Sequence, residues 1–157
     1  MFRYSLVYGV RDIHHPLCAV IKSYASVLKT TAFSPRITIR HSLSFETALS
    51  LHRLFSAEYN LPKIDFVDEV SVSCSMLFNA NGKRVSFYSL EQPVLLNDQR
   101  VPGLHVSLAY KLGTPFTLSE RNMVGPWHGT LLPDDLVLTV YSCHAKSPKF
   151  WRQVLQS

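Results

Sequence analysis

The first thirty residues carry a strand-like pattern and then a helix-like pattern. Residues 2–10 are rich in aromatic and β-branched side chains, which predicts a strand. Asp12 is the expected cap of a following helix, because Pro16 is tolerated in a first helical turn. Apolar side chains then recur at helical spacing at Leu17, Val20, Ile21, Tyr24 and Leu28.

A second strand and helix follow the first pair. Residues 36–43 predict a strand that opens after Pro35, and Ser44 has the side chain of a helix cap. Residues 60–63 contain a proline and predict the end of this helix. Its buried face is expected to carry Ala48, Leu51, Leu54 and Phe55.

Strand-like segments dominate the second half of the chain. They cover residues 67–78, 84–90, 104–112, 136–143 and 150–155, the last with a short helix as the alternative. Residues 79–82 have the Asn and Gly content of a tight turn, so the first two segments predict a hairpin. The polar stretch 93–102 predicts a loop. These patterns together predict an α+β fold with early helices and late strands.

Length and composition narrow the class of protein. A chain of 157 residues suits one domain spanning 1–157 that buries its own core. Hydrophobic residues make up 46% and charged residues 17%, which excludes a disordered or fibrous chain. No apolar run approaches the roughly 20 residues of a membrane-spanning helix, and the start lacks the apolar stretch of a signal peptide. We therefore expect no membrane partner.

Cysteines, histidines and charge refine this picture. Cys18, Cys74 and Cys143 are odd in number and lack zinc-site spacing, which predicts free thiols in a reducing, cytoplasmic compartment. No histidine has metal-ligand spacing, so neither a metal nor another cofactor is expected. The formal net charge of +5 favours a polyanionic ligand such as a nucleotide or RNA.

Two predicted strands share a local pattern of basic, apolar, hydroxyl and apolar residues. They are Arg36-Ile-Thr-Ile-Arg40 and His105-Val-Ser-Leu-Ala109. Alternate residues of a strand share a face, so polar side chains of each strand are expected together. This face is predicted to carry Arg36, Thr38 and Arg40 on one strand, and His105, Ser107 and Lys111 on the other, where the small residue Ala109 shares it. The opposite faces are expected in the core, with Ile37, Ile39, Val106 and Leu108.

Such strands, side by side, make a polar floor suited to a phosphodiester. Imidazole acts as general acid or base near neutral pH. Hydroxyls and cations bind phosphate oxygens and stabilise the charge that develops on them. No carboxylate cluster is evident beside these strands, so a divalent metal is not required. Each tripeptide alone is a weak indication, and the matching of two strands carries the prediction.

The two segments resemble the paired motifs of the 2H phosphoesterase superfamily, each a His-x-Thr/Ser followed by an apolar residue. Pro35-Arg-Ile-Thr-Ile-Arg40 is similar to the first motif, and Gly103-Leu-His-Val-Ser-Leu108 to the second. The resemblance implies a two-lobed fold, with antiparallel sheets flanked by helices and the motifs facing each other across a central groove. The implied catalytic residues are His105, Arg36, Thr38 and Ser107, and the implied substrate-binding residues are Arg40 and Lys111.

Within this superfamily the chain is most similar to viral 2′,5′-phosphodiesterases. These are accessory or polyprotein domains of betacoronaviruses and toroviruses, and the carboxy-terminal domain of the rotavirus capping protein. The resemblance implies metal-free cleavage of 2′,5′-oligoadenylate, the messenger that activates RNase L, in the host cytoplasm and without a DNA partner. In the implied mechanism one His deprotonates the ribose 3′-hydroxyl and the other protonates the departing 5′-oxygen. Thr38 and Ser107 hold the phosphate oxygens.

Arg36 departs from the pattern, because it stands where the first motif has His. Arginine stays protonated and cannot act as a general base, although it binds phosphate well. Losing one acid–base partner costs about 10²–10⁴-fold in rate. His41 falls on the opposite face if the strand is regular, and a bulge that would turn it to the same face is not expected, so His41 is not predicted to replace the missing His.

Three functions therefore stay open. The first is a 2′,5′-phosphodiesterase impaired by Arg36. The second is a 2′,3′-cyclic phosphodiesterase or RNA-end-processing esterase of the same superfamily. The third is a non-catalytic nucleotide- or RNA-binding module, in which Arg36 is a binding residue rather than an inactivating substitution.

Overall fold

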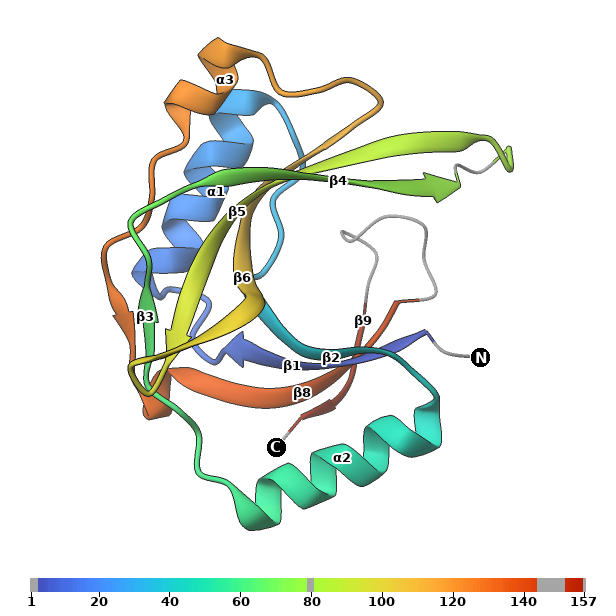
Figure 1. The fold of residues 1–157 in the computed structure, drawn as a ribbon, viewed down its shortest axis with the longest axis vertical. Helices are drawn as coiled ribbons and strands as arrows, with labels where there is room; N and C mark the ends of the chain where they lie inside the picture. Colours follow the sequence, from blue (N-terminus) through green and yellow to red (C-terminus); the bar gives the residue numbers. More distant parts are fainter. Residues whose placement is uncertain (1–2, 79–80, 144–151, 157) are drawn as a thin grey trace.

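The computed structural model describes residues 3–78, 81–143 and 152–156 (Figure 1). Three α-helices and one 3₁₀ turn lie in these ranges: α1 (Pro16–Leu28), α2 (Phe45–Glu58), α3 (Leu118–Met123) and η1 (Pro133–Asp135). The strands in the same ranges are β1 (Tyr4–Val10), β2 (Arg36–Leu43), β3 (Ile64–Phe66), β4 (Ser71–Phe78), β5 (Arg84–Leu96), β6 (Gln99–Leu112), β7 (Thr130–Leu131), β8 (Leu136–Ser142) and β9 (Arg152–Gln156). The α+β class predicted from the sequence is confirmed.

These strands form one antiparallel sheet. The order is β7-β3-β5-β6-β2-β1-β8-β9, and β4 pairs with β5 beside this path. The sheet curls so that β4 and β5 arch over β1, β2 and β8 (Figure 1). The expected separate sheets are therefore replaced by one continuous sheet. The two motif strands, β2 and β6, are neighbours in it and do not face each other across a groove.

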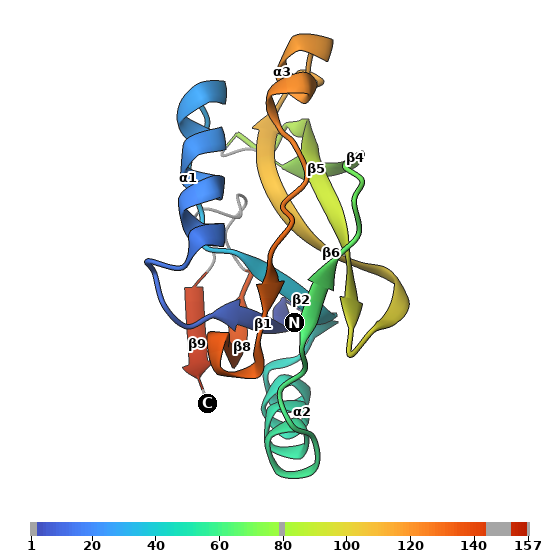
Figure 2. The ribbon, with the colours of Figure 1, turned by 90° about the vertical axis from the view of Figure 1, so that its left-hand side faces the viewer.

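The two longer helices lie outside the curl (Figures 1 and 2). α2 packs against β1 and β8, and α1 against β6 and α3. Buried motif residues fill the interface on this side, which we call the helix face of the sheet. Ile37 is 1% exposed and Val106 0%, as expected, whereas Ile39 is only partly buried. No helix in the described ranges is long and apolar enough to cross a membrane.

The cap of α1 differs from the prediction. The helix begins at Pro16, but its cap is His15, whose Nδ1 accepts a hydrogen bond from the Leu17 amide at 3.1 Å. Asp12 caps the preceding turn instead, accepting from the His14 amide at 2.9 Å. A turn between residues 12 and 15 therefore separates the predicted cap from the helix, and Asp12 satisfies that turn.

The buried face of α2 is rotated from the predicted one. Ser44 caps the helix as expected, accepting from the Thr47 amide at 3.2 Å. Leu54 is 49% exposed, while His52 is only 6% exposed. The His52 Nε2 donates to the Leu138 carbonyl oxygen at 3.1 Å, because a carbonyl can only accept. This hydrogen bond compensates the burial of a polar ring and turns His52 toward the sheet.

The predicted loop at 93–102 is wrong. β5 continues to Leu96 and β6 begins at Gln99, so the connection is a two-residue turn of Asn97 and Asp98. Both residues have positive φ, 48° and 67°, as a hairpin turn that follows the twist of its strands requires. The polar residues of this stretch therefore lie in and around a tight hairpin turn, not in a loop. The predicted strand at 150–155 corresponds to β9, although residues 144–151 lie outside the described part.

Candidate functional site

A pocket of about 360 Å³ opens on the face of the sheet opposite the helices. Four of its lining residues come from the two matching segments: Arg36 and Thr38 on β2, and His105 and Ser107 on β6. The other lining residues come from β4, β5 and β6: Ser73, Cys74, Ser75, Phe87, Ser89, Glu91 and Tyr110. We call this the motif pocket. It brings together all four residues that the sequence predicts as catalytic.

One residue pair sets the arrangement of the motif pocket. Ile37 of β2 lies opposite Val106 of β6 in the antiparallel ladder. An antiparallel pair has a local two-fold axis perpendicular to the sheet, and this axis relates the residues before and after each paired position. Arg36 and His105 are therefore equivalent positions, roughly 8 Å apart at their Cα atoms from the strand spacing and rise. Thr38 and Ser107 are equivalent in the same way.

His105 is oriented through both ring nitrogens. Its Nδ1 donates to the Gly103 carbonyl oxygen at 2.9 Å, which fixes the proton on Nδ1. Gly103 has a φ of 81°, a conformation that favours glycine and turns this carbonyl toward the ring. The Nε2 lies 3.2 Å from Glu91 Oε1, and the imidazole is 37% exposed. Both nitrogens thus face acceptors, and a proton on Nε2 points toward the Glu91 carboxylate, which lines the motif pocket.

Glu91 is a pocket residue that the sequence did not reveal. Its Oε1 accepts a hydrogen bond from Ser73 Oγ at 2.6 Å as well as facing His105. Its side chain is 20% exposed. Glu91 reaches the pocket because it lies opposite Ser107 in the β5–β6 ladder. The only signal in the sequence was the alternation of Ser89 and Glu91, and its meaning depends on a register that spans the hairpin turn.

The Ser107 hydroxyl can donate a hydrogen bond to an anion in the pocket. Ser89 donates to Ser107 Oγ at 3.0 Å, and both side chains are buried. Because Ser107 accepts this bond, its own hydroxyl hydrogen is left to point elsewhere, and Ser107 lines the pocket. A phosphate oxygen in the pocket is a suitable acceptor for it.

Arg36 is held against an aromatic ring from β8. Its guanidinium carbon lies 5.1 Å from the centroid of the Tyr141 ring, within the range of a cation–π interaction. Burial raises the pKa of Tyr141, and the Arg36 charge offsets part of that rise. Burial also raises the pKa of Cys143, while the Ser5 hydroxyl and the Arg36 charge act in the opposite direction. Arg36 is therefore a fixed cation at one side of the motif pocket.

Lys111 does not reach the motif pocket, and a β-bulge explains why. Glu91 pairs with Ser107 but Leu90 pairs with Ala109, so Leu108 is an extra residue in β6. An extra residue shifts every later side chain to the opposite face. Tyr110 consequently lines the pocket, and Lys111 turns away from it. The Lys111 ammonium pairs with Glu120 of α3 at 2.6 Å.

A second bulge removes Arg40 from the pocket in the same way. Val7 pairs with Thr38 and Leu6 pairs with Arg40, so Ile39 is an extra residue in β2. Arg40 therefore lies on the opposite face from Thr38, is exposed, and donates to the Ile39 carbonyl oxygen at 3.1 Å. His41 is exposed as well, with its Nδ1 3.0 Å from Ser42 Oγ. The predicted sharing of faces is wrong for Arg40, Ala109 and Lys111, and Ala109 lies in the hydrophobic core instead.

Aromatic rings form one wall of the motif pocket. Phe87 and Tyr110 both line it, and their rings stack with centroids 4.9 Å apart and an interplanar angle of 28°. Phe33 packs on the Tyr110 ring at 4.4 Å. The pocket thus has a polar floor and an aromatic side, a combination that accommodates a phosphate and an adjoining nucleobase.

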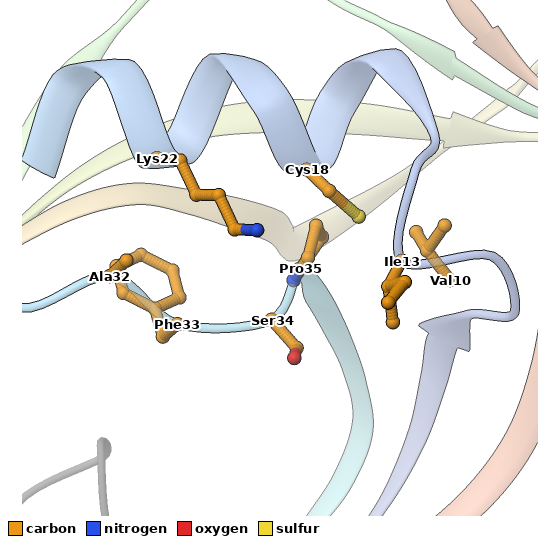
Figure 3. A pocket seen from close by; sticks show the side chains of 8 residues that line it. All are labelled: Val10, Ile13, Cys18, Lys22, Ala32, Phe33, Ser34 and Pro35. Atoms are coloured by element: carbon orange, nitrogen blue, oxygen red, sulfur yellow. The ribbon is translucent and has the colours of Figure 1, made fainter.

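A second pocket of about 300 Å³ lies between the amino-terminal half of α1 and the segment that leads into β2 (Figure 3). It is lined by Val10, Ile13, Cys18, Lys22, Ala32, Phe33, Ser34 and Pro35. Burial raises the pKa of the Cys18 thiol, with opposing effects from the Lys22 and Asp12 charges. A thiol in this state is a poor nucleophile. This pocket lacks the imidazole and paired hydroxyls that make the motif pocket the better candidate for phosphodiester chemistry.

Comparison with models of known protein families, with curated proteins and with solved structures gave no match. Within residues 3–78, 81–143 and 152–156, no group of three or more His, Cys, Asp or Glu side chains is arranged to hold a metal ion. The chemical groups that line the motif pocket in this part of the chain are one imidazole, one guanidinium, one carboxylate, one thiol and several hydroxyls.

Proposed function

We propose that the chain is a 2H-type 2′,5′-phosphodiesterase whose motif pocket binds 2′,5′-oligoadenylate and whose turnover is impaired by Arg36. The observation that carries this proposal is the pairing of Ile37 with Val106. Through that pair, a cation and an imidazole take equivalent positions on the floor of one pocket, with a hydroxyl beside each. A phosphodiester bound between them meets both motifs at once.

Each residue has a role that its chemistry supports. Arg36 binds two phosphate oxygens through its forked guanidinium, and Thr38 and Ser107 donate hydrogen bonds to them. In the reaction the ribose 3′-hydroxyl attacks phosphorus and loses its proton, while the bond to the 5′-oxygen breaks. His105 delivers a proton from Nε2 to that departing oxygen, giving a cyclic 2′,3′-phosphate and a free 5′-hydroxyl.

The missing partner in this scheme is a general base. Arg36 holds the position equivalent to His105 but cannot accept a proton. The 3′-hydroxyl proton therefore passes to water, and we expect turnover about 10²–10⁴-fold below that of a two-histidine site. Binding is retained, because the charge of Arg36 attracts the phosphate.

The aromatic wall supports a nucleotide rather than an isolated phosphate. Phe87 and Tyr110 line the pocket next to its polar floor. Stacking of a base on an aromatic side chain is worth about 1–3 kcal/mol and does not depend on a particular base. Adenine next to a 2′,5′-linked phosphate fits this combination of surfaces.

A non-catalytic nucleotide-binding module is the second candidate function. Arg36 itself favours it, because a guanidinium held against the Tyr141 ring is a good phosphate ligand and a poor acid–base group. The two candidates share the same pocket and differ only in whether the bound diester is cut.

Substituting Arg36 separates the candidates. The unmodified chain, Arg36→His and Arg40→His are assayed with 2′,5′-linked and 3′,5′-linked oligoadenylates and with a 2′,3′-cyclic nucleotide. Arg40→His is the matched control, since Arg40 is exposed on the same strand but faces away from the pocket. We expect Arg36→His to raise cleavage of the 2′,5′-linked substrate at least about 100-fold and Arg40→His to change nothing.

If Arg36→His cleaves none of the substrates while the unmodified chain binds the 2′,5′-linked one, the binding module is correct and the phosphodiesterase is wrong. Cleavage of the cyclic nucleotide alone identifies the cyclic phosphodiesterase alternative. His105→Ala in the Arg36→His background is expected to abolish turnover, and retained turnover would remove His105 from the site.

A further inference from the structure

We propose that Glu91 makes the motif pocket selective for phosphodiesters, which carry one negative charge, over phosphomonoesters, which carry two. The inference rests on the proposed function, in that the pocket binds a phosphodiester. It assigns to a carboxylate on β5 the discrimination between an internal phosphate and a terminal one.

The Glu91 carboxylate lies between His105 of β6 and Ser73 of β4. Its Oε1 lies 3.2 Å from His105 Nε2 and 2.6 Å from Ser73 Oγ. His105 Nε2 is also the atom that faces a bound phosphodiester in the proposed reaction. Glu91 therefore interacts with a donor that the substrate needs, and a bound phosphate lies within a few ångströms of its negative charge.

Glu91 is held in place by its strand and by a neighbouring hydroxyl. Its side chain is 20% exposed, and its backbone lies opposite Ser107 in the β5–β6 ladder. The Ser73 hydroxyl anchors the carboxylate from β4 on the other side of β5. Moving the carboxylate out of the pocket breaks this hydrogen bond, so the negative charge stays near the incoming phosphate.

The motif pocket contains charges of both signs. Among the described residues that line it, Arg36 is always positive, His105 is positive when both nitrogens are protonated, and Glu91 is the acidic side chain. The cations alone attract a dianion more strongly than a monoanion. Glu91 opposes this preference, because its repulsion of a dianion is twice its repulsion of a monoanion at the same distance.

The functional consequence concerns competitors. A linkage between two nucleosides is a diester with one charge, whereas the terminal phosphate of a nucleoside monophosphate carries nearly two charges above its second pKa of about 6. Glu91 lets the pocket accept the linkage and reject free nucleotides of the same base. Its role is in specificity, and it need not exchange a proton with the substrate.

The test uses two ligands that share adenine and differ in phosphate charge. Affinities for the 2′,5′-linked adenosine dinucleotide and for adenosine 5′-monophosphate are measured by calorimetry near pH 8, where the monoester is a dianion. The proteins are the unmodified chain, Glu91→Gln, Glu91→Asp and Glu69→Gln. Glu69 is the matched control, since its exposed carboxylate pairs with Arg100 at 3.3 Å and does not line the pocket.

We expect Glu91→Gln to raise affinity for the dinucleotide about 5-fold and for the monophosphate about 25-fold, because the second charge doubles the free-energy gain. Glu91→Asp keeps the charge and is expected to keep the selectivity, which guards against an effect of altered packing. Glu69→Gln is expected to change either affinity less than about 2-fold.

The results distinguish this inference from the proposed function. Equal gains for both ligands, or no gain for either, overturn the selectivity role while dinucleotide binding by the unmodified chain still supports the function. Loss of selectivity in Glu91→Asp also overturns it. If neither the unmodified chain nor Glu91→Gln binds the dinucleotide, the proposed function fails and this inference fails with it.

Discussion

Arg36 and His105 are equivalent residues of two antiparallel strands, related by the local two-fold axis between Ile37 and Val106. The backbone at this site is symmetric, but the two side chains differ in their chemistry. One position holds a permanent cation stacked on Tyr141, and the other holds a titratable ring in contact with Glu91. This asymmetry leads to different expectations for binding and for turnover, since a cation suffices to hold a phosphate and a proton donor alone does not suffice to cut it.

The placement of the cations predicts their separate contributions to binding. Arg36→Ala is expected to weaken binding of the 2′,5′-linked dinucleotide about 10–100-fold, because a hydrogen bond to a charged group is worth about 1.5–3 kcal/mol. Lys111→Ala is expected to change it less than about 2-fold, since Lys111 pairs with Glu120 away from the pocket. Calorimetric titration measures both. A large loss in Lys111→Ala would contradict the role of the Leu108 bulge.

The two buried serines predict a graded effect. Ser107 lines the pocket and donates to the phosphate in our proposal, whereas Ser89 donates to Ser107. Ser107→Ala is expected to weaken dinucleotide binding about 5-fold, which corresponds to one hydrogen bond of about 1 kcal/mol. Ser89→Ala is expected to have the smaller effect, as it only orients Ser107. The opposite ranking of the two affinities would indicate that Ser89 contacts the ligand directly.

The local pattern of the sequence predicts α1, α2, most of the longer strands and four pocket residues, but it does not predict α3, β3 or β7. The places of Arg36, Thr38, His105 and Ser107 follow from strand alternation alone, because residues 36–38 and 105–107 pair with their neighbouring strands without a bulge. The alternation fails just beyond them. Arg40 and Lys111 were misplaced by one extra residue in each strand, and a bulge has no clear mark in a sequence of apolar and hydroxyl side chains.

Long-range pairing accounts for the features that the sequence did not predict. Glu91 lines the pocket because of the register of β5 on β6, and that register depends on the two-residue turn of Asn97 and Asp98. The polar residues around this turn led to the prediction of a loop. The cap of α1 was misassigned for a local reason, since His15 and Asp12 both have side chains able to accept from a backbone amide. Propensity ranks such residues but does not choose between them.

The three cysteines predict a difference in thiol reactivity that is independent of any function. Burial raises the pKa of Cys18 and of Cys143, so each has less thiolate at neutral pH than an ordinary cysteine, whereas Cys74 is exposed. We expect a thiol reagent to modify Cys74 first in the folded protein and the other two at least about tenfold more slowly. Mass spectrometry of time points identifies the labelled residue. Raising the pH is expected to narrow the difference in labelling rate, because the pH then comes closer to the raised pKa values of Cys18 and Cys143 and their thiolate fractions increase.

The pair that sets the site also predicts a stability effect with a matched control. Ile37 is 1% exposed and packs on the helix face opposite Val106, whereas Ile39 of the same strand is only partly buried. Ile37→Ala is expected to lower the free energy of unfolding by about 2–5 kcal/mol, and Ile37→Val by about 0.5–1.5 kcal/mol. Ile39→Ala is expected to cost less than Ile37→Ala, because less apolar surface leaves the core. Urea unfolding followed by fluorescence measures all three.

The same variants connect the core to the pocket. The Ile37→Ala substitution leaves a cavity in place of the isoleucine side chain, and this cavity loosens the backbone that carries Arg36 and Thr38. The folded fraction of this variant is therefore expected to bind the dinucleotide more weakly. Ile37→Val keeps most of the packing and is expected to retain the affinity. If Ile37→Ala lost stability but bound the dinucleotide as tightly as the unmodified chain, the two tripeptides would not need this pair to form a site. The local two-fold axis would then be a feature of the sheet without consequence for binding.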